Sequence, residues 1–431
     1  MENEITPGTP EEVLDAVAEA LAEGTPLEVL GAGTKRNYGR PAEAERTLSL
    51  SRLAGITMYE PNELVMTARP GTPLAEIEAS LDKNGQQLAF EPADYGPLLA
   101  GAALLEGAAL LEGAEGREKA GGATIGGIFA CNLSGPRRIA AGAARDHILG
   151  VKAVSGRGEA FKSGGRVVKN VTGYDMSKLL TGSFGTLAVM TEVTFKVLPA
   201  PDDSRTVVIM GLDDRAALGA MTKALGGPWE VTAAAHLPKP LAQRSWVARI
   251  AGANAATVMR LEGPAPSVAA RAEGLGKGLA GLGTAGELAH ADTRALWREI
   301  RDVHPLVSPP HLGPAAEVWR ISAPPSEAAA ITERIARNLR TLAFYDWGGG
   351  LIWLAIGELE DMAAGGRAAI VRAAIGEAGG HGTLIKADAE TRRTVPVFHP
   401  QPEALAGLTR RVKENFDPKG ILNAGRMYAG V

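Results

Sequence analysis

The sequence of 431 residues predicts an α+β protein built from more than one domain. Three observations lead to this prediction. The length exceeds the ~100–200 residues of an ordinary single domain. Residues 187–197 alternate apolar and polar side chains, which is the period of a half-buried strand. After residues 199–203 the chain changes to alanine-rich helical stretches that alternate with short strands, a pattern typical of a separate α+β domain.

The N-terminal part predicts a regular series of elements. Thr9 and Glu12 form a capping box with Pro10 at the first helical position, so we expect a helix to begin there and to end at Gly24. Four elements are expected to follow it: a strand at 27–30, a glycine loop at 31–35, a strand at 64–68, and a helix that starts at 72–73 and ends at 85.

An identical hexapeptide, GAALLE, occupies residues 101–106 and 107–112 within an unusual stretch at 98–122. Two copies are too few for a repeat architecture. We expect a loop or a short helix here, with a functional lid as the alternative. Farther on, the sequence SGRG at 155–158 predicts a hairpin turn.

The part from 204 to 390 predicts a second α+β domain that contains a glycine-rich stretch at 274–286. An amphipathic helix is expected at 402–415, followed by the turn sequence FDPKG. Strands are expected in the second domain at 205–210, 229–235, 246–250, 318–322 and 350–356.

Composition excludes several classes of protein. The formal net charge of −4 gives no general attraction to nucleic acid. The single cysteine, Cys131, excludes an intrachain disulfide and a cysteine-bound iron–sulfur cluster, and the seven histidines lack a zinc-binding spacing, so no metal is expected. No apolar run approaches the ~18 residues of a membrane span, and no signal peptide is visible. We expect a cytoplasmic protein without direct membrane insertion; attachment to the inner face of the membrane through partners stays open.

Glycine-rich loops are the main candidates for function. Residues 31–35 follow a strand, but Arg36 replaces the third glycine of a dinucleotide fingerprint and Ser51 stands where an acid is needed. Successive backbone N–H groups in such turns can surround an anion such as a diphosphate. Glycine also lets the backbone approach a ligand closely. Further loops of this kind lie at 124–127, 134–135 and 182–186.

Taken in order, these loops resemble the FAD-binding domain of the vanillyl-alcohol-oxidase family, a PCMH-type domain. The resemblance rests on TIGGIFACNLSGPRR at 124–138, GGRVVKNVTGYD at 164–175, GSFGTL at 182–187 and FDPKGILNAGR at 416–426. Within that family the chain is most similar to the FAD-binding E-type subunit of glycolate oxidase, also called glycolate dehydrogenase. That narrower similarity rests on WRIS at 319–322, DWGG at 346–349 and GGH at 379–381.

The resemblance implies a fold and a cofactor. Residues 1–200 would form a two-subdomain FAD-binding domain with an insertion at 98–122, residues 201–395 an α+β cap domain on an antiparallel sheet, and residues 396–431 a segment that returns to the FAD-binding domain. The FAD would be bound non-covalently, because neither His nor Cys occurs at 36–38. The residues expected to contact it are Gly31, Ala32, Gly33, Thr34, Lys35, Thr124, Ile125, Gly126, Gly127, Asn132, Ser134, Gly135, Gly185, Thr186, Val189 and Asn423.

The resemblance also implies an activity, the oxidation of glycolate, a small 2-hydroxy acid, to glyoxylate with electron transfer to a partner. The expected partners are a second FAD-containing subunit and an iron–sulfur subunit. Arg320 is a candidate to pair with the substrate carboxylate, and His381 is a candidate base for the hydroxyl proton. The alternatives are a structural ion pair for Arg320 and a loop hydrogen bond for His381. Arg137 and Arg138 would meet the diphosphate or a partner, or order their loop.

Two other functions stay open. The first is a self-sufficient FAD-dependent 2-hydroxy-acid dehydrogenase, and the second is a non-catalytic assembly subunit with a structural FAD site. The chain lacks the His-x-Gly-Asp-Gly-Asn-x-His segment of the catalytic subunit in related D-2-hydroxy-acid dehydrogenases. That difference argues against the first alternative and keeps the second one open.

Overall fold

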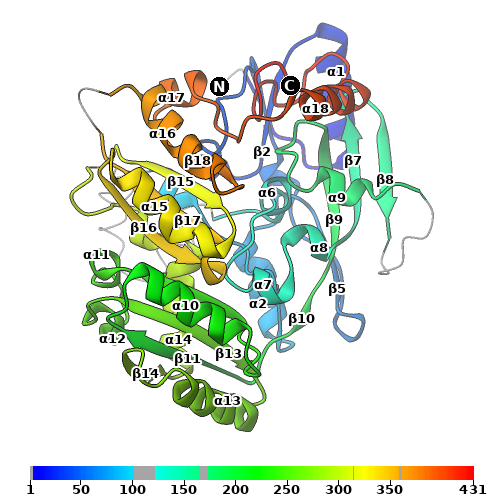
Figure 1. Ribbon diagram of the computed structural model, residues 1–431. Coiled ribbons are helices and arrows are strands. Elements are labelled where there is room, and N and C mark those ends of the chain that lie inside the picture. Colours follow the sequence, from blue (N-terminus) through cyan, green and yellow to red (C-terminus); the bar gives the residue numbers. More distant parts are fainter. Residues whose placement is uncertain (1–2, 101–121, 166–172, 314, 359–361) are drawn as a thin grey trace, which may run out of the picture.

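The computed structural model describes residues 3–100, 122–165, 173–313, 315–358 and 362–431. Two parts are distinguished by their sheets (Figure 1). We call residues 3–199 and 400–431 the base, and residues 203–399 the cap. The repeated hexapeptides at 101–112, and the segment 166–172 within the third motif quoted above, lie outside the described residues, so the expectations about them stay predictions.

A small parallel sheet in the base packs against the first helix, α1 (Pro10–Glu23). Thr9 Oγ1 accepts a hydrogen bond from the backbone N–H of Glu12 at 3.2 Å, and Gly24 ends the helix with φ 71°. These two features confirm the predicted helix and both of its ends. The sheet has the strand order β1 (Glu4–Ile5), β3 (Arg46–Ser49), β2 (Leu27–Leu30).

A second sheet of the base is antiparallel, and the predicted hairpin turn at 155–158 joins two of its strands. The strand predicted at 187–197 is present as β9, but its first residues, Ala188 to Met190, are buried on both faces. Val189 lies in the core beneath α1, whereas Ala188 and Met190 belong to the core on the other side. The strand order is β4 (Ile56–Glu60), β5 (Val65–Ala68), β9 (Ala188–Lys196), β7 (Ile148–Ser155), β8 (Ala160–Gly164).

Short helices and one strand pair complete the base. The helix predicted at 72–85 is present as α2, although it ends three residues earlier. The strand pair β6 (Gln86–Gln87) and β10 (Leu198–Pro199) lies where the chain leaves for the cap. The helices are α2 (Leu74–Asp82), α3 (Gly96–Ala100), α6 (Ile125–Cys131), α7 (Arg138–Ala141), α8 (Ala144–His147), α9 (Met176–Leu180) and α18 (Glu403–Phe416).

The cap is one antiparallel sheet with four helices on its outer face, α10, α13, α15 and α16, whereas α11, α12 and α14 pack into the core shared with the base (Figure 1). Side chains alternate along each strand: Phe344 and Trp353 join the core shared with the base, whereas Tyr345 and Ile352 pack under the cap helices. The strand order is β14 (Thr284–Leu288), β11 (Asp203–Met210), β13 (Ala256–Gly263), β12 (Ala233–Leu237), β16 (Thr341–Asp346), β17 (Leu351–Ile356), β15 (Glu317–Ser322), β18 (His381–Lys386).

The helices of the cap correct one prediction and refine two. Residues 246–250 were expected to form a strand and instead lead into the short helix α12, because Ala and Arg at 248–251 favour a helical turn. The strand expected at 229–235 lies four residues later, as β12. The glycine-rich stretch covers the end of α13 and the start of β14. The cap helices are α10 (Asp214–Leu225), α11 (Lys239–Ala242), α12 (Ala248–Ala251), α13 (Ala265–Gly278), α14 (His290–Arg301), α15 (Ala328–Ala336), α16 (Ala364–Gly376) and α17 (Ala389–Thr394).

The last segment returns to the base. The helix predicted at 402–415 is present as α18, and the following residues pair with strand β2 through a bridge between Leu422 and Leu27. The buried amine of Lys413 donates to Asp417 Oδ2 and to the carbonyls of Thr186 and Leu422, at 2.7, 2.7 and 2.8 Å. The end of the chain therefore completes the base at the edge of the first glycine loop.

Candidate functional site

Two glycine loops of the base, 31–35 and 124–127, pack directly against each other. A Cβ on Gly31 would collide with Oγ1 of Thr124, and a Cβ on Gly126 would lie 2.6 Å from Cβ of Pro70. The backbone N–H of Gly126 donates to the Pro70 carbonyl at 2.9 Å, and that of Ile125 donates to the Thr72 carbonyl at 3.0 Å. Gly31 and Gly126 are therefore needed for loop packing, and two of the expected N–H donors are used within the fold.

Gly33 and Gly127 differ from these glycines because a Cβ would clash at neither position. Gly33 has φ 76° and nothing within 4 Å of its Cβ position. A Cβ on Gly127 would lie 3.6 Å from Nζ of Lys35, an ordinary contact distance. Among the described residues, no group accepts a hydrogen bond from the backbone N–H groups of residues 32–35. Free donors and open space therefore meet at one place between the two loops.

Lys35 supplies a positive charge at this place. Its side chain is buried, and its Nζ donates to Oγ1 of Thr34 at 3.2 Å. No carboxylate forms an ion pair with it in the described part of the chain, and burial lowers its pKa. A buried ammonium without a counter-ion is unfavourable. The free N–H groups and this amine fit the diphosphate of a dinucleotide cofactor.

Asn132, Ser134 and Gly135 order the loop that follows α6. Asn132 has φ 51°, and its Oδ1 accepts from the backbone N–H of Arg145 at 3.0 Å. Oγ of Ser134 accepts from the backbone N–H of Ala144 at 2.9 Å. The carbonyl of Gly135 accepts from Nε1 of Trp347, a cap residue, at 3.1 Å. The side chains of Asn132 and Ser134 thus fix the loop, and the loop in turn contacts the cap.

Asn423 joins three segments of the base. Its Oδ1 accepts from the backbone N–H of Val29 at 2.8 Å, and its Nδ2 donates to the Phe184 carbonyl at 2.7 Å. A Cβ on Gly185 would lie 2.8 Å from the same Nδ2. Thr186 donates through Oγ1 to the Ser183 carbonyl at 2.7 Å, so its side chain also serves the fold. The return segment is thereby bound to the strand that carries the first loop.

Arg320 and His381 lie on neighbouring strands of the cap, on the face toward the base. Arg320 pairs in register with Thr383, and His381 pairs with Ser322, so the two side chains are diagonal neighbours. Cζ of Arg320 lies 5.0 Å from the ring centroid of Trp347. Among the described residues no carboxylate forms an ion pair with Arg320, and no hydrogen bond of its guanidinium is present. The structural ion pair weighed for Arg320 is therefore not present in this part of the chain.

His381 is exposed at the beginning of β18. Partial desolvation lowers its pKa, and the nearby guanidinium of Arg320 lowers it further. The ring is therefore neutral at neutral pH and able to accept a proton. Its exposed position at the start of a strand, beside three glycines in sequence, leaves the ring accessible.

Aromatic residues and one buried acid line the contact between base and cap. Tyr95 of the base lies 5.5 Å from Trp353 of the cap, centroid to centroid, in an edge-to-face arrangement. Asp346 ends β16 and accepts from the backbone N–H of Trp347 at 2.7 Å. Burial raises the pKa of Asp346 to about 7. Trp347 is itself almost fully buried, as expected for a core residue.

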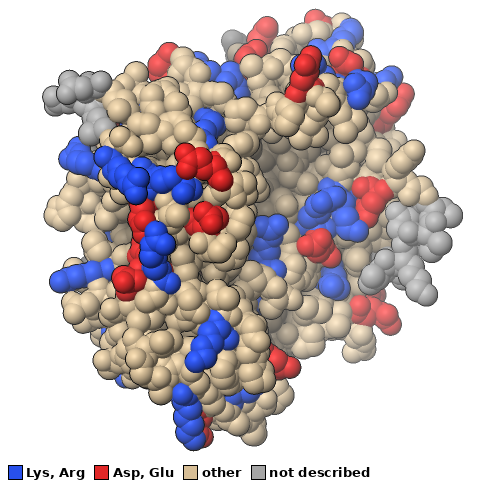
Figure 2. Space-filling view, in the orientation of Figure 1, with Lys and Arg blue, Asp and Glu red and all other residues tan. Residues whose placement is uncertain are grey.

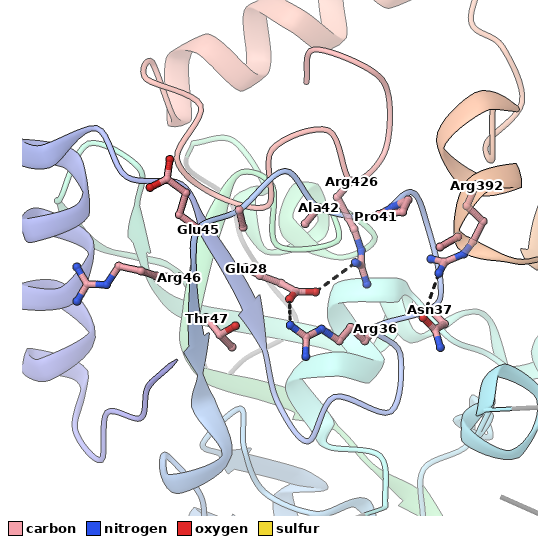
Figure 3. Close-up of a pocket in the computed structure, with 12 residues that line it drawn as sticks. Glu28, Arg36, Asn37, Pro41, Ala42, Glu45, Arg46, Thr47, Arg392 and Arg426 are labelled. Atoms are coloured by element: carbon pink, nitrogen blue, oxygen red, sulfur yellow. Dashed lines mark hydrogen bonds and ion pairs between the residues drawn. The ribbon is translucent and has the colours of Figure 1, made fainter. Parts of the chain in front are cut away.

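A pocket of about 370 Å³ lies behind the first glycine loop (Figure 3). Arg426 donates through Nη2 to the carbonyl of Lys35 at 2.9 Å, and Arg392 donates through Nη2 to Oδ1 of Asn37 at 3.0 Å. Glu28 forms ion pairs with Arg36 and Arg426. These contacts brace residues 35–39 from the side opposite the open space.

Sequence reasoning missed most of this support. Nothing in the sequence around Arg392 or Glu28 indicates that they support the first glycine loop. Arg392 donates to Asn37, which lies 355 positions away in the chain. Glu28 is one polar residue of a short strand. Arg426 stood inside the quoted NAGR sequence, but nothing in that sequence identifies its contact with the Lys35 carbonyl. Lys35 is buried without an ion-pair partner among the described residues. The sequence does not predict this, because the burial depends on Gly127 and Cys131, which lie close to its side chain in the fold.

Known proteins similar to this chain share its sequence pattern. The family described as "FAD binding domain" matches residues 2–121. The glycolate oxidase subunit GlcE of Escherichia coli (strain K12) is 33% identical over 418 residues, which is 97% of this chain and 97% of that protein. The D-2-hydroxyglutarate dehydrogenase of Xanthomonas citri pv. viticola is 29% identical over 204 residues, 47% of this chain and 38% of that enzyme.

Solved structures share its fold. The p-cresol methylhydroxylase structure has a TM-score of 0.68 at 14% identity and covers 98% of this chain and 88% of that one. The 4-ethylphenol oxidase of Gulosibacter chungangensis has a TM-score of 0.67 at 16% identity, over 99% and 89% of the two chains. The predicted α+β, PCMH-type fold and the predicted FAD cofactor are thus confirmed. The chain belongs to the family of FAD-dependent oxidoreductases that contains the glycolate oxidase subunit GlcE.

Proposed function

We propose that this chain is the FAD-binding subunit of a glycolate oxidase, or glycolate dehydrogenase, complex that oxidises glycolate to glyoxylate. Similarity to GlcE over 97% of both chains supports the assignment. The observation that carries the chemistry is the unpaired guanidinium of Arg320 on the cap face toward the base. Bound FAD would supply the acceptor for the hydride of the hydroxyl-bearing carbon.

The chain's own residues have separate tasks in this proposal. Arg320 pairs with the carboxylate of the 2-hydroxy acid and orients it. His381, neutral at neutral pH, accepts the proton of the hydroxyl group at a ring nitrogen. Lys35 and the N–H groups of residues 32–35 hold the diphosphate of the cofactor.

Partners complete the reaction. With Cys131 as its only cysteine, the chain provides no cysteine cluster for iron–sulfur chemistry, so its electrons pass to another subunit or to a diffusible acceptor. We propose a second FAD-containing subunit and an iron–sulfur subunit as these partners. The 25% identity to GlcD of Bacillus subtilis (strain 168) over 207 residues supports such a family relationship. None of the described helices is long and apolar enough to cross a membrane; we propose a cytoplasmic protein that reaches the inner face of the membrane through partners.

The proposed organisation follows the sheets. Residues 1–200 form the FAD-binding domain, 201–395 the cap domain, and 396–431 the returning segment. The sheets of the base, the eight-stranded sheet of the cap and the Leu422–Leu27 bridge support this division. Val397 accepts from the backbone N–H of Leu384 in β18 and packs with the cap, which favours a start of the returning segment near residue 400.

The visible absorbance of the purified chain tests the function, before and after anaerobic addition of glycolate. Bleaching of the bound flavin is the expected result, and Arg320→Gln should abolish it while the flavin stays bound. A flavin that stays oxidised in the chain alone but bleaches in the assembled complex would place the chemistry on a partner. Flavin loss in Gly127→Asp with full activity of the complex would favour the purely structural FAD site.

A further inference from the structure

We propose that Arg138 is the second anion-binding residue of the substrate site, so that one guanidinium from the base and one from the cap hold the same carboxylate. This inference rests on the proposed function, because it concerns the carboxylate of the 2-hydroxy acid. Arg138 lies at the start of α7, in the loop that the Gly135–Trp347 hydrogen bond attaches to the cap.

The neighbouring arginine shows why Arg138 is distinctive. Arg137 donates from Nε and Nη2 to the two carboxylate oxygens of Glu262, at 2.9 and 2.7 Å, and its Nη2 also lies 3.4 Å from Glu91. Its charge is therefore fully compensated. Within the described part of the chain, the guanidinium of Arg138 has no hydrogen bond and no ion pair. Of these two consecutive arginines, Arg137 is paired with carboxylates, whereas Arg138 has no carboxylate partner among the described residues. Arg138 is therefore the one that can pair with an anionic ligand.

Arg138 and Arg320 share one indole. Cζ of Arg138 lies 4.4 Å, and Cζ of Arg320 5.0 Å, from the ring centroid of Trp347. The two arginines come from different parts of the fold, α7 in the base and β15 in the cap. Both guanidiniums contact the same ring, so the proposed ligand would lie beside this indole. Trp347 attracts each cation through its ring, and its Nε1 donates to the Gly135 carbonyl, which holds the indole against the loop that carries Arg138.

The surrounding charges leave this place positive. Burial lowers the pKa of Arg138, and the charge of Arg320 adds to that effect. His381 feels both arginines and also His399. Asp146 lies near Arg138 but accepts from the backbone N–H of Ala143 at 2.9 Å and forms no ion pair with it. Two half-buried guanidiniums beside each other are unfavourable until an anion lies between them.

The side chains of the proposed site are within reach of solvent: Arg138 and Arg320 are partly exposed, and His381 is exposed. Figure 2 shows a hollow between the cap and the base with Lys and Arg atoms in and beside it. A carboxylate has two oxygens and pairs with guanidinium N–H groups in a planar, bidentate manner. The ligand class that fits is therefore a small 2-hydroxy monocarboxylate whose carboxylate bridges the two parts of the fold, which leaves the hydroxyl-bearing carbon free to face the cofactor.

Binding of oxalate and of acetate to the FAD-loaded full-length chain tests this inference without turnover, because neither has a hydroxyl-bearing carbon to oxidise. Acetate has a single carboxylate, so it tests whether both arginines hold the same group. The dissociation constant is measured by titration of the flavin absorbance and, independently, by calorimetry. The variants are Arg138→Gln, Arg138→Lys, Arg320→Gln and the Arg138→Gln/Arg320→Gln double variant. Arg52→Gln is the matched control, because Arg52 is an exposed arginine of the base. Glycolamide, which lacks the carboxylate, is the neutral probe.

We expect Arg138→Gln and Arg320→Gln each to weaken oxalate binding at least tenfold, and Arg138→Lys to recover part of the loss. For acetate, the double variant should lose less than the product of the two single effects, because both arginines hold one group. Glycolamide binding and the Arg52→Gln variant should change less than twofold. Flavin content of Arg138→Gln should equal that of the wild type, and its melting temperature should be unchanged or higher, since the guanidinium makes no hydrogen bond in the described structure and its charge is disfavoured by burial and by Arg320.

The outcomes separate this inference from the proposed function. If oxalate binds and only Arg320→Gln weakens it, the role of Arg138 is refuted and the proposed function stands. If the wild-type chain with bound FAD does not bind oxalate at all, both the anion site and substrate oxidation by this chain are refuted. Strictly multiplicative losses of acetate binding in the double variant would place the two arginines on different groups and refute the bridging carboxylate.

Discussion

Arg137 of the base and Glu262 of the cap form a two-point ion pair, with Nε and Nη2 of the arginine donating to the two carboxylate oxygens at 2.9 and 2.7 Å. Glu91 and Arg260 extend it into a buried network of two acids and two bases. The network fixes the cap against the base beside the candidate site, since Arg138 follows directly in the chain.

Replacing one member of this network should destabilise the protein strongly. Arg137→Met leaves Glu262 buried beside a single remaining base, and loss of one partner of a buried pair costs about 3–5 kcal/mol. The double variant Arg137→Met/Glu262→Met removes both charges and should recover most of that loss. Denaturant titrations of the three proteins provide the free energies of unfolding, and an equal loss in the single and double variants would contradict this account.

Gly127→Asp should abolish FAD binding without unfolding the chain. A Cβ at this position lies 3.6 Å from Nζ of Lys35, so the new carboxylate pairs with the buried amine and occupies the place of the diphosphate. We expect a colourless protein with an unchanged or higher melting temperature. Gly126→Ala is the contrasting variant: its Cβ would lie 2.6 Å from Pro70, so it should lower stability itself. Retention of flavin by Gly127→Asp would disprove the assigned place.

Lys35 should make the stability of the FAD-free protein depend on pH. Burial lowers its pKa in the folded chain, so the unfolded chain binds more protons below its ordinary pKa of 10.5 and stability rises with pH up to that value. Lys35→Met should remove this slope, stabilise the FAD-free protein and weaken FAD binding by about 10–100-fold, the value of a charge-assisted hydrogen bond. Urea titrations between pH 7 and 10 and fluorescence titration with FAD measure both effects.

Asp346 should give the opposite dependence at lower pH. Its folded pKa of about 7 lies above the ordinary 3.8, so the folded chain holds the proton longer and stability falls as pH rises from about 4 to 7. Glu299, whose pKa is also raised to about 7 by burial, adds to the same slope. Asp346→Asn and Glu299→Gln should each remove one part of it. A slope unchanged in both variants would contradict the raised values.

Asn423→Ala should loosen the first glycine loop. The variant loses the hydrogen bonds to Val29 and Phe184 and leaves a buried N–H and a buried carbonyl without partners, which costs about 2–4 kcal/mol. FAD affinity should fall with stability, because Val29 precedes the loop. Asn415→Ala, an exposed asparagine on α18, is the control and should behave as wild type. Calorimetric melting with and without FAD measures both properties.

Local chemistry made much of the fold predictable. The two ends of α1 are determined locally: Thr9 and Pro10 begin the helix and Gly24 ends it. The hairpin at 155–158 likewise depends on neighbouring residues only. The strand expected at 246–250 was wrong because its alternation of apolar residues also fits a short helix, and the choice depends on packing around Ile250. Periodicity alone does not decide between the two in so short a segment.

The sequence predicted which residues belong to the candidate site, but it did not predict how they contact one another. The resemblance identified the glycine loops, Arg320 and His381, but the sequence does not distinguish glycines that pack loops, such as Gly31, from those that leave space, such as Gly33. That distinction depends on Thr124, some ninety residues away. The difference between the paired Arg137 and the unpaired Arg138 depends likewise on Glu262 in the cap.

The bridge between Leu422 and Leu27 and the amine of Lys413 under Thr186 carry a consequence for biosynthesis. Strand β2 is synthesised early, yet its edge at Leu27 is completed only by residues around 422, almost four hundred positions later in the chain. A nascent chain therefore exposes an incomplete strand edge beside the first glycine loop until those residues are made. Stable cofactor loading is expected only after residues 413–423 have been synthesised and have packed against the base.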